Sequence, residues 1–220
     1  MPRPALVEEE IASFRRRAAD AAMHLFAEQG YAAVTMRGLG AALDVSAMTI
    51  YRYLSGKDEL FVLVRAEAFR RFADALVAAL ADAPADDPVG RLFELKRAYI
   101  AFALAQPDAY RIMFELRGMT EPPKGPARDE LAAQSRRAFA CLHGCVVDAV
   151  NHGLLAGDPL THAHLLWAST HGLVSLHLAG QLSRERLQLL ARELWELGGA
   201  LPAPARKTKR SPRNSKQRIS

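Results

Sequence analysis

Apolar residues recur every three or four positions from Ile11 to Phe26, the spacing that places side chains on one face of a helix. Three glutamates at positions 8–10 precede this stripe, where the positive end of a helix dipole favours acidic side chains. Gly30 follows the stripe and can adopt the left-handed backbone that ends a helix. The pattern therefore predicts a first helix over about residues 9–29.

Two short helices are predicted next, separated by a tight turn. Thr35 suits the N-cap of the first of them, and the apolar period breaks at residues 44–46. Ser46 can cap the second, with Val45 and Ile50 at the two positions that pack together as a hydrophobic staple. Two short helices joined by a three-residue turn are the elements of a helix-turn-helix.

Longer helices are predicted for most of the remaining chain. Ser55 and Asp58 have the spacing of a capping box for a long helix that ends near Ala81. Further helical stretches, between breaks rich in proline and glycine, are expected at about residues 89–105, 108–117, 128–155, 160–181 and 184–198. No stretch has a convincing strand pattern, so the expected fold class is all-α.

Charge changes this picture only at the C-terminus. The net charge is +5, but seven of the 29 basic residues lie in residues 206–220, where there is no acid. The tail, residues 200–220, has no apolar period and is expected to be disordered. The first sixty residues hold seven basic and eight acidic side chains, so a case for DNA binding must rest on pattern and not on basicity.

The composition argues against several classes of protein. Cys141 and Cys145 are the only cysteines and lie four apart in a predicted helix, which suits a reducing cytosol better than a disulfide. No leader and no bilayer-spanning apolar run is recognisable, so a cytoplasmic protein without a membrane partner is expected. Catalytic motifs are absent, and the histidines at 162, 164, 171 and 177 lack metal-ligand spacing. We therefore expect no enzyme activity, metal or cofactor.

The predicted third helix and its flanks carry a specific combination of residues. It runs from Val34 to Arg37, from Val45 through Ser-Ala-Met-Thr-Ile-Tyr-Arg-Tyr to Leu54, and from Lys57 to Leu60. Over residues 10–65 this combination resembles the DNA-binding domain of the TetR family of bacterial regulators. Asp44 stands where that family usually has glycine, and aspartate tolerates a left-handed backbone better than most residues.

The resemblance implies DNA contacts for nine residues. Base contacts in the major groove, with the arginines as guanine readers, are implied for Arg37, Ala47, Met48, Tyr51 and Arg52. Phosphate contacts are implied for Thr35, Thr49, Tyr53 and Lys57. Each residue taken alone could instead be a packing group or a solvated charge, whereas the whole set at this spacing favours recognition of DNA.

The stretch around Trp167 and His171-Gly172 resembles the WHG-type C-terminal domain of one branch of the same family. The resemblance implies a helix-turn-helix domain of three helices, residues 1–56, followed by a helical effector-binding and dimerisation domain, residues 57–199. The candidate residues of an effector cavity, which are mostly apolar, are Phe69, Leu95, Tyr99, Phe102, Met113, Phe114, Trp167 and His171. They favour an apolar or aromatic effector, although aromatic residues at helical spacing often belong to an ordinary core.

Two stripes of small residues among leucines lie on the predicted helices at 128–155 and 160–181. The candidate interface residues in these stripes are Cys141, Cys145, Ala149, Ser169, Gly172 and Leu176. Small residues let helices approach closely, which suits a four-helix bundle made by two copies; the alternative is that both stripes pack within one subunit. The resemblance favours the homodimer, because such folds bind two operator half-sites.

The sequence thus predicts a sequence-specific transcriptional regulator that binds a palindromic double-stranded operator as a homodimer. Repression, and release by a small effector, follow from the resemblance alone. The alternatives are a helical adapter that binds other proteins through its long stripes and a small helical enzyme. The outer face of the third helix discriminates between them, because neither alternative needs Arg37, Tyr51 or Arg52.

Overall fold

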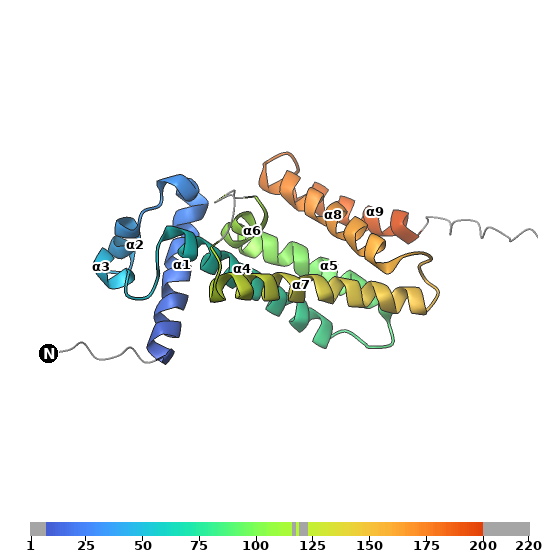
Figure 1. The fold of residues 1–220 in the computed structure, drawn as a ribbon. Coiled ribbons are helices and arrows are strands. Elements are labelled where there is room, and N and C mark those ends of the chain that lie inside the picture. The colour runs from blue at the N-terminus through green and yellow to red at the C-terminus, as the bar shows by residue number, and fades with distance from the viewer. Residues whose placement is uncertain (1–7, 116–117, 119–122, 200–220) are drawn as a thin grey trace, which may run out of the picture.

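The computed structural model describes residues 8–115, 118 and 123–199, with the backbone alone for residues 195–199. These residues form helices and no strand (Figure 1), which confirms the all-α fold class. The helices are α1 (Glu8–Ala33), α2 (Met36–Ala42), α3 (Ala47–Ile50), α4 (Lys57–Ala81), α5 (Pro88–Ala105), α6 (Pro107–Phe114), α7 (Pro126–Asn151), α8 (Pro159–Leu178) and α9 (Arg184–Gly199). The tail expected to be disordered, residues 200–220, lies outside the described residues.

The helices fall into a small group and a larger one. Figure 1 shows α1, α2 and α3 at one end of the molecule, with α4 leading from them into the larger group. There α7 packs along α4 and α5, and α6 contacts both α4 and α1. The pair α8 and α9 forms an outer layer on α5 and α7. The helix α4 therefore belongs to both groups.

Gly30 interrupts α1 close to the predicted end of the first helix. Its backbone has φ 75° and ψ 165°, which is outside the helical region and favours glycine. Helical geometry then resumes as far as Ala33. Before the break, α1 buries the predicted apolar stripe, including Phe14, Ala18 and Phe26.

Proline and aspartate set the starts of the helices in the larger group. Proline is the first residue of α5, α6, α7 and α8, where its missing N–H would have no partner within the helix. The Asp87 carboxylate accepts a hydrogen bond from the Gly90 amide at 2.9 Å, and the Asp158 carboxylate accepts one from the Thr161 amide at 2.8 Å. These local signals explain why the predicted breaks and the observed ones nearly coincide.

The predicted capping box at the start of α4 is wrong. The N-cap is Gly56, and the Ser55 amide and hydroxyl donate to the Glu59 carboxylate at 2.7 and 2.8 Å. Asp58 instead accepts a hydrogen bond from the Tyr31 hydroxyl. The N-cap lies one residue later than expected. The acidic side chain that bonds back to the residues before the helix therefore also lies one residue later, and Glu59 takes the role predicted for Asp58.

Candidate DNA-binding surface and ligand cavity

The turn between α2 and α3 holds the two helices in close contact. The Val45 amide donates to the Gly40 carbonyl at 2.9 Å, and a Cβ on Gly40 would lie only 2.7 Å from the Val45 carbonyl oxygen. Asp44 adopts φ 54°, a left-handed backbone that aspartate tolerates. Glycine at position 40 and aspartate at 44 together permit this tight turn.

The start of α3 is capped as the sequence predicts. The Ser46 hydroxyl accepts a hydrogen bond from the Thr49 amide at 3.1 Å, and Thr35 caps α2 through the Gly38 amide at 3.0 Å. Regular α-helix ends at Ile50, but hydrogen-bonded turns continue to Leu54. Because Ile50 and Leu54 are almost fully buried, they fix this segment on the core and leave Tyr51 and Arg52 exposed between them.

The outer face of this segment is unusually exposed for its composition. Met48 is 71% exposed, the highest value among the large apolar side chains of the described residues, and Tyr51 is 53% exposed. Arg37 and Arg52 are also exposed, and within the described residues neither lies within 4 Å of a carboxylate. Their guanidinium groups can therefore donate to an external acceptor. Ala47, the fifth expected base reader, is half-buried beside them.

The four residues expected at phosphates are more constrained. Thr35 and Thr49 have their hydroxyls in capping contacts, since Thr49 Oγ1 lies 2.9 Å from Ser46 Oγ. The Tyr53 ring stacks on the Phe14 ring with centroids 4.0 Å apart. The Lys57 ammonium donates to the Tyr31 and Ala32 carbonyls at 3.1 and 3.2 Å.

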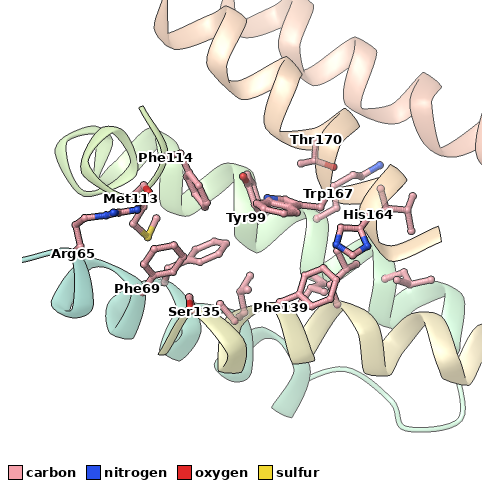
Figure 2. A pocket seen from close by; sticks show the side chains of 18 residues that line it. Arg65, Phe69, Tyr99, Met113, Phe114, Ser135, Phe139, His164, Trp167 and Thr170 are labelled. Carbon is pink, nitrogen blue, oxygen red and sulfur yellow. Dashed lines mark hydrogen bonds between the residues drawn. The ribbon is translucent and has the colours of Figure 1, made fainter. Parts of the chain in front are cut away.

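A cavity of about 380 Å³ lies among α4, α5, α6, α7 and α8 (Figure 2). Aromatic and aliphatic side chains form most of its wall, with Phe69 from α4, Phe139 from α7 and Trp167 from α8 among them. Its volume is within the roughly 300–1,000 Å³ usual for cavities that bind small molecules. The wall can therefore enclose an apolar ligand.

Most of the cavity residues expected from the sequence line this wall. They are Phe69, Leu95, Tyr99, Met113, Phe114 and Trp167. Phe102 and His171 are not among the lining residues. Phe102 is buried behind the wall, with its ring centroid 5.1 Å from that of Phe72. The His171 ring is engaged behind the wall with two tyrosines.

A buried polar cluster supports one side of the cavity. The Tyr110 hydroxyl lies 2.6 Å from His171 Nδ1, and the Tyr99 hydroxyl lies 3.1 Å from that of Tyr110. Burial raises the pKa of Tyr99 to about 12 and also raises the pKa of Tyr110. Burial lowers the pKa of His171, so the imidazole is neutral at pH 7. The cluster therefore joins α5, α6 and α8 through neutral hydrogen bonds.

Several polar and charged residues of the wall were not predicted from the sequence. These are Arg65, Lys96, Ser135, His164 and Thr170. The signal for Arg65 was available, because it precedes Phe69, Phe72 and Leu76 at three- and four-residue spacing on α4. A charged residue in an apolar stripe was the feature to notice. No comparable signal marks Ser135 or Thr170.

The expected interface residues divide into inner and outer sets. Cys145 and Ala149 are each 1% exposed and pack inside the subunit, so they cannot contact a partner, and their assignment to an interface is wrong. Leu176 is 48% exposed, whereas Cys141, Ser169 and Gly172 are half-buried. On α8, Leu165 is also 56% exposed, and a Cβ on Gly172 would meet nothing within 4 Å. Among the described residues, nothing covers the outer face of α8 at Leu165, Gly172 and Leu176.

The described part of the chain contains neither a metal-binding cluster nor a membrane-spanning helix. No cluster of three or more histidine, cysteine, aspartate or glutamate side chains there is arranged to hold a metal ion. None of the helices found there has the length and apolar character needed to cross a bilayer.

Family models and known proteins agree with this architecture. Residues 19–64 match the model of bacterial regulatory proteins of the tetR family, and residues 92–198 match a tetracyclin repressor-like C-terminal domain. The HTH-type transcriptional regulator HbdR of Aromatoleum sp. (strain CIB) is 31% identical over 175 residues, which cover 76% of this chain and 72% of HbdR.

Solved structures share the fold at lower identity. The fatty acid degradation regulator FadR from Bacillus halodurans superposes with a TM-score of 0.70 at 18% identity, over 91% of this chain and all of FadR. AibR, solved in complex with isovaleryl coenzyme A and operator DNA, gives 0.64 at 19% identity, over 83% of this chain and 96% of AibR. Together with the helix-turn-helix geometry, these matches establish that the chain belongs to the TetR family and is a DNA-binding transcriptional regulator.

Proposed function

We propose that the chain acts in the cytoplasm as a homodimeric repressor that binds a palindromic operator and releases it when a small molecule fills the cavity. The observation that carries this proposal is the position of α4. Its first turn lies beside the helix-turn-helix, where the Lys57 ammonium donates a hydrogen bond to the Tyr31 carbonyl at the end of α1. Its later turns line the cavity through Phe69 and Phe72. A ligand that moves the cavity wall would thus act on the same helix that supports the DNA-binding surface.

The exposed face of α3 and its following turn supports the base-reading role. We assign base contacts to Arg37, Ala47, Met48, Tyr51 and Arg52. The two guanidinium groups can bond guanine O6 and N7 together, and Met48 offers an apolar contact for a thymine methyl group. The two arginines and Met48 are exposed in the free subunit, so no rearrangement is needed before they reach a groove.

Phosphate contacts are proposed for Thr35, Thr49, Tyr53 and Lys57. Thr35 caps α2 and Thr49 lies in the first turn of α3, where backbone amides and the helix dipole favour an anion. Tyr53 and Lys57 are held by Phe14 and by the end of α1, so they would position the protein on the duplex without reading its sequence.

The outer face of α8 supports the homodimer. Leu165 and Leu176 are about half exposed, and Ser169 and Gly172 lie between them on the same side of the helix. Two copies of this face can pack closely because glycine and serine present little bulk. A dimer also supplies the second recognition surface that a palindromic operator requires.

Operator binding by matched arginine variants tests the proposed function. The measurement is fluorescence anisotropy of a labelled duplex that carries an inverted repeat from the DNA beside the gene. Arg52→Ala should weaken specific binding about tenfold or more, because a bidentate contact to guanine contributes ~1–3 kcal/mol of discrimination. Arg97→Ala is the control, since Arg97 is an exposed arginine on α5 that pairs with Glu94. Equal affinities of both variants and the wild type would refute the assignment.

A further inference from the structure

The ligand cavity contains a charged group without a charged partner, the guanidinium of Arg65. Its Nη2 donates to the Met113 carbonyl at 3.0 Å, at the end of α6. Its Nε is buried and has no hydrogen-bond partner in the part of the chain that the structure describes. Across the described residues, no carboxylate forms an ion pair with it. A buried donor that stays unpaired destabilises the protein, so this arrangement is unfavourable unless something else uses it.

The charges of the wall all have one sign. The lining residues include Arg65 and Lys96 and no aspartate or glutamate. Lys96 is already engaged, since its ammonium donates to the Ala191 carbonyl. Burial lowers the pKa of Arg65, but a guanidinium remains charged at neutral pH. The cavity is therefore suited to an anion, and a cationic ligand would be repelled by the guanidinium of Arg65.

Figure 2 shows how this charge is placed in the cavity. Arg65 lies at one end, beside Met113, and Trp167 and Phe139 lie toward the other end. Between these ends, Phe69 and Phe114 contribute apolar rings to the wall, and Ser135 contributes a hydroxyl. A ligand that satisfies both regions needs an anionic group at one end and an apolar body.

We propose that the cavity binds a small carboxylate with an apolar body, whose carboxylate accepts hydrogen bonds from Arg65. The inference rests on the proposed function, in which this cavity is the effector site. A planar carboxylate matches the fork of a guanidinium and can use the unpaired Nε together with a terminal nitrogen. The volume of about 380 Å³ is at the lower end of the usual range, which favours a compact body.

Three probe ligands with the same chain test the charge preference. Decanoate, 1-decanol and decylamine share an apolar body and differ in the charge of the end group. Affinity for the full chain is measured by isothermal titration calorimetry. The fluorescence of its two tryptophans, of which Trp167 lines the cavity, reports occupation of the cavity. Decanoate should bind at least about tenfold more tightly than 1-decanol, because a charge-assisted hydrogen bond is stronger than a neutral one, and decylamine should bind most weakly. The pair 2-naphthylacetate and 2-naphthaleneethanol repeats the comparison with an aromatic body.

Substitutions at Arg65 assign the preference to this residue. Arg65→Gln should weaken decanoate binding about tenfold and change 1-decanol binding by no more than about twofold. Arg65→Lys keeps the charge and should keep part of the preference, which also guards against misfolding of the glutamine variant. Arg70→Gln is the control on the same helix, because Arg70 pairs with Glu67 and Asp74 outside the cavity. It should leave both affinities within about twofold.

Several outcomes overturn the inference. They are equal binding of decanoate and 1-decanol, tighter binding of decylamine, no binding of either carboxylate at millimolar concentration, or equal losses for acid and alcohol in Arg65→Gln. Operator binding measured in the same samples separates this inference from the proposed function. If decanoate binds through Arg65 but operator DNA is not released, the release of DNA by a ligand is refuted and the carboxylate preference stands. If the alcohol binds and releases DNA but the acid does neither, the preference for a carboxylate is refuted and the release of DNA by a ligand stands.

Discussion

The DNA-binding surface and the ligand cavity differ in how much of the chain is needed to build each. The surface comes from residues 35–57, and hydrogen bonds between near neighbours hold it, such as those from the Thr49 amide to the Ser46 hydroxyl and from the Val45 amide to the Gly40 carbonyl. The cavity wall combines residues from Arg65 to Thr170, drawn from five helices. A local site can be fixed by capping and turn chemistry, whereas a cavity depends on how distant helices pack together.

The two regions also differ in packing. Behind α3 the support is dense, since Ile50 and Leu39 have no exposed surface. Between α4 and α8 the packing leaves a void of about 380 Å³. We therefore expect the two regions to respond differently to the same kind of substitution, and the variants below test that difference.

Truncation of a large side chain should give the largest difference in stability loss between the two regions. Ile50→Ala removes three carbons from a fully buried position and should lower the free energy of unfolding by ~2–5 kcal/mol, with loss of operator binding. Phe139→Ala, at the half-buried cavity wall, should lower it by less because the void already exists there. Urea denaturation followed by circular dichroism measures both values. Equal losses would mean that the cavity wall is packed as tightly as the support.

Glycine substitutions should give opposite signs in the turn of the DNA-binding surface and in α7, a helix that contributes to the cavity wall. Gly40→Ala places a Cβ 2.7 Å from the Val45 carbonyl oxygen, a backbone atom that cannot move without opening the turn, so it should destabilise by ~1–3 kcal/mol. Gly144→Ala lies in α7 with nothing within 4 Å of the new Cβ. It should stabilise by ~0.5–1 kcal/mol, because alanine favours helix over glycine. Thermal unfolding of the two variants checks the sign, and a stabilised Gly40→Ala would show that the turn is not tight.

The same contrast explains what the sequence could predict. The caps Thr35 and Ser46 and the buried Ile50 followed from short-range patterns, because a cap and its partner are three residues apart. The error at Ser55 was also local and small, a cap displaced by one residue. Local chemistry thus determined nearly all of the geometry of the helix-turn-helix.

The cavity was less predictable because helix rotation is a tertiary property. Leucine, tryptophan, alanine and histidine are spread around α8, so its sequence does not tell which face meets the void. Phe102 and Phe139 illustrate the result: the first packs behind the wall and the second lines it. Cys145 and Ala149 were placed at an interface because small residues suit any close helix contact, including the one that α7 makes within the subunit.

A cavity-filling substitution should separate ligand binding from DNA binding. Ala138→Leu adds bulk to a wall residue and should reduce decanoate affinity, with operator affinity unchanged. Because space is available there, the free energy of unfolding should change by no more than ~1 kcal/mol, unlike overpacking of a filled core. Ala140→Leu, an exposed position on the same helix, is the control and should leave ligand affinity unchanged. If Ala138→Leu lowered the free energy of unfolding as much as Ile50→Ala does, the void would have to lie elsewhere.

The smallest expected effect concerns the contact between α6, which contributes Met113 and Phe114 to the cavity wall, and α1 of the DNA-binding end. His24 Nδ1 lies 3.0 Å from the Asp108 carboxylate, and Nε2 lies 3.1 Å from that of Glu28. The hydrogen bond to Asp108, followed by the charge of Glu28, raises the pKa of His24 above 6.5 in the folded chain. A raised pKa means that protonated His24 stabilises the fold, fully below its unfolded pKa of about 6.5 and no longer once the pH exceeds the folded value.

The comparison of wild type with His24→Gln at two pH values measures this effect. The difference in melting temperature should be larger at pH 6 than at pH 8.5, and Asp108→Asn should reduce the difference at pH 6 because it removes the principal cause of the raised pKa. Since the imidazole is exposed to solvent, added salt should shrink the difference at pH 6 as well. If instead the difference is the same at both pH values, His24 joins α1 to α6 only as a neutral hydrogen-bonding group, and the link between the cavity wall and the DNA-binding end does not respond to pH through this residue.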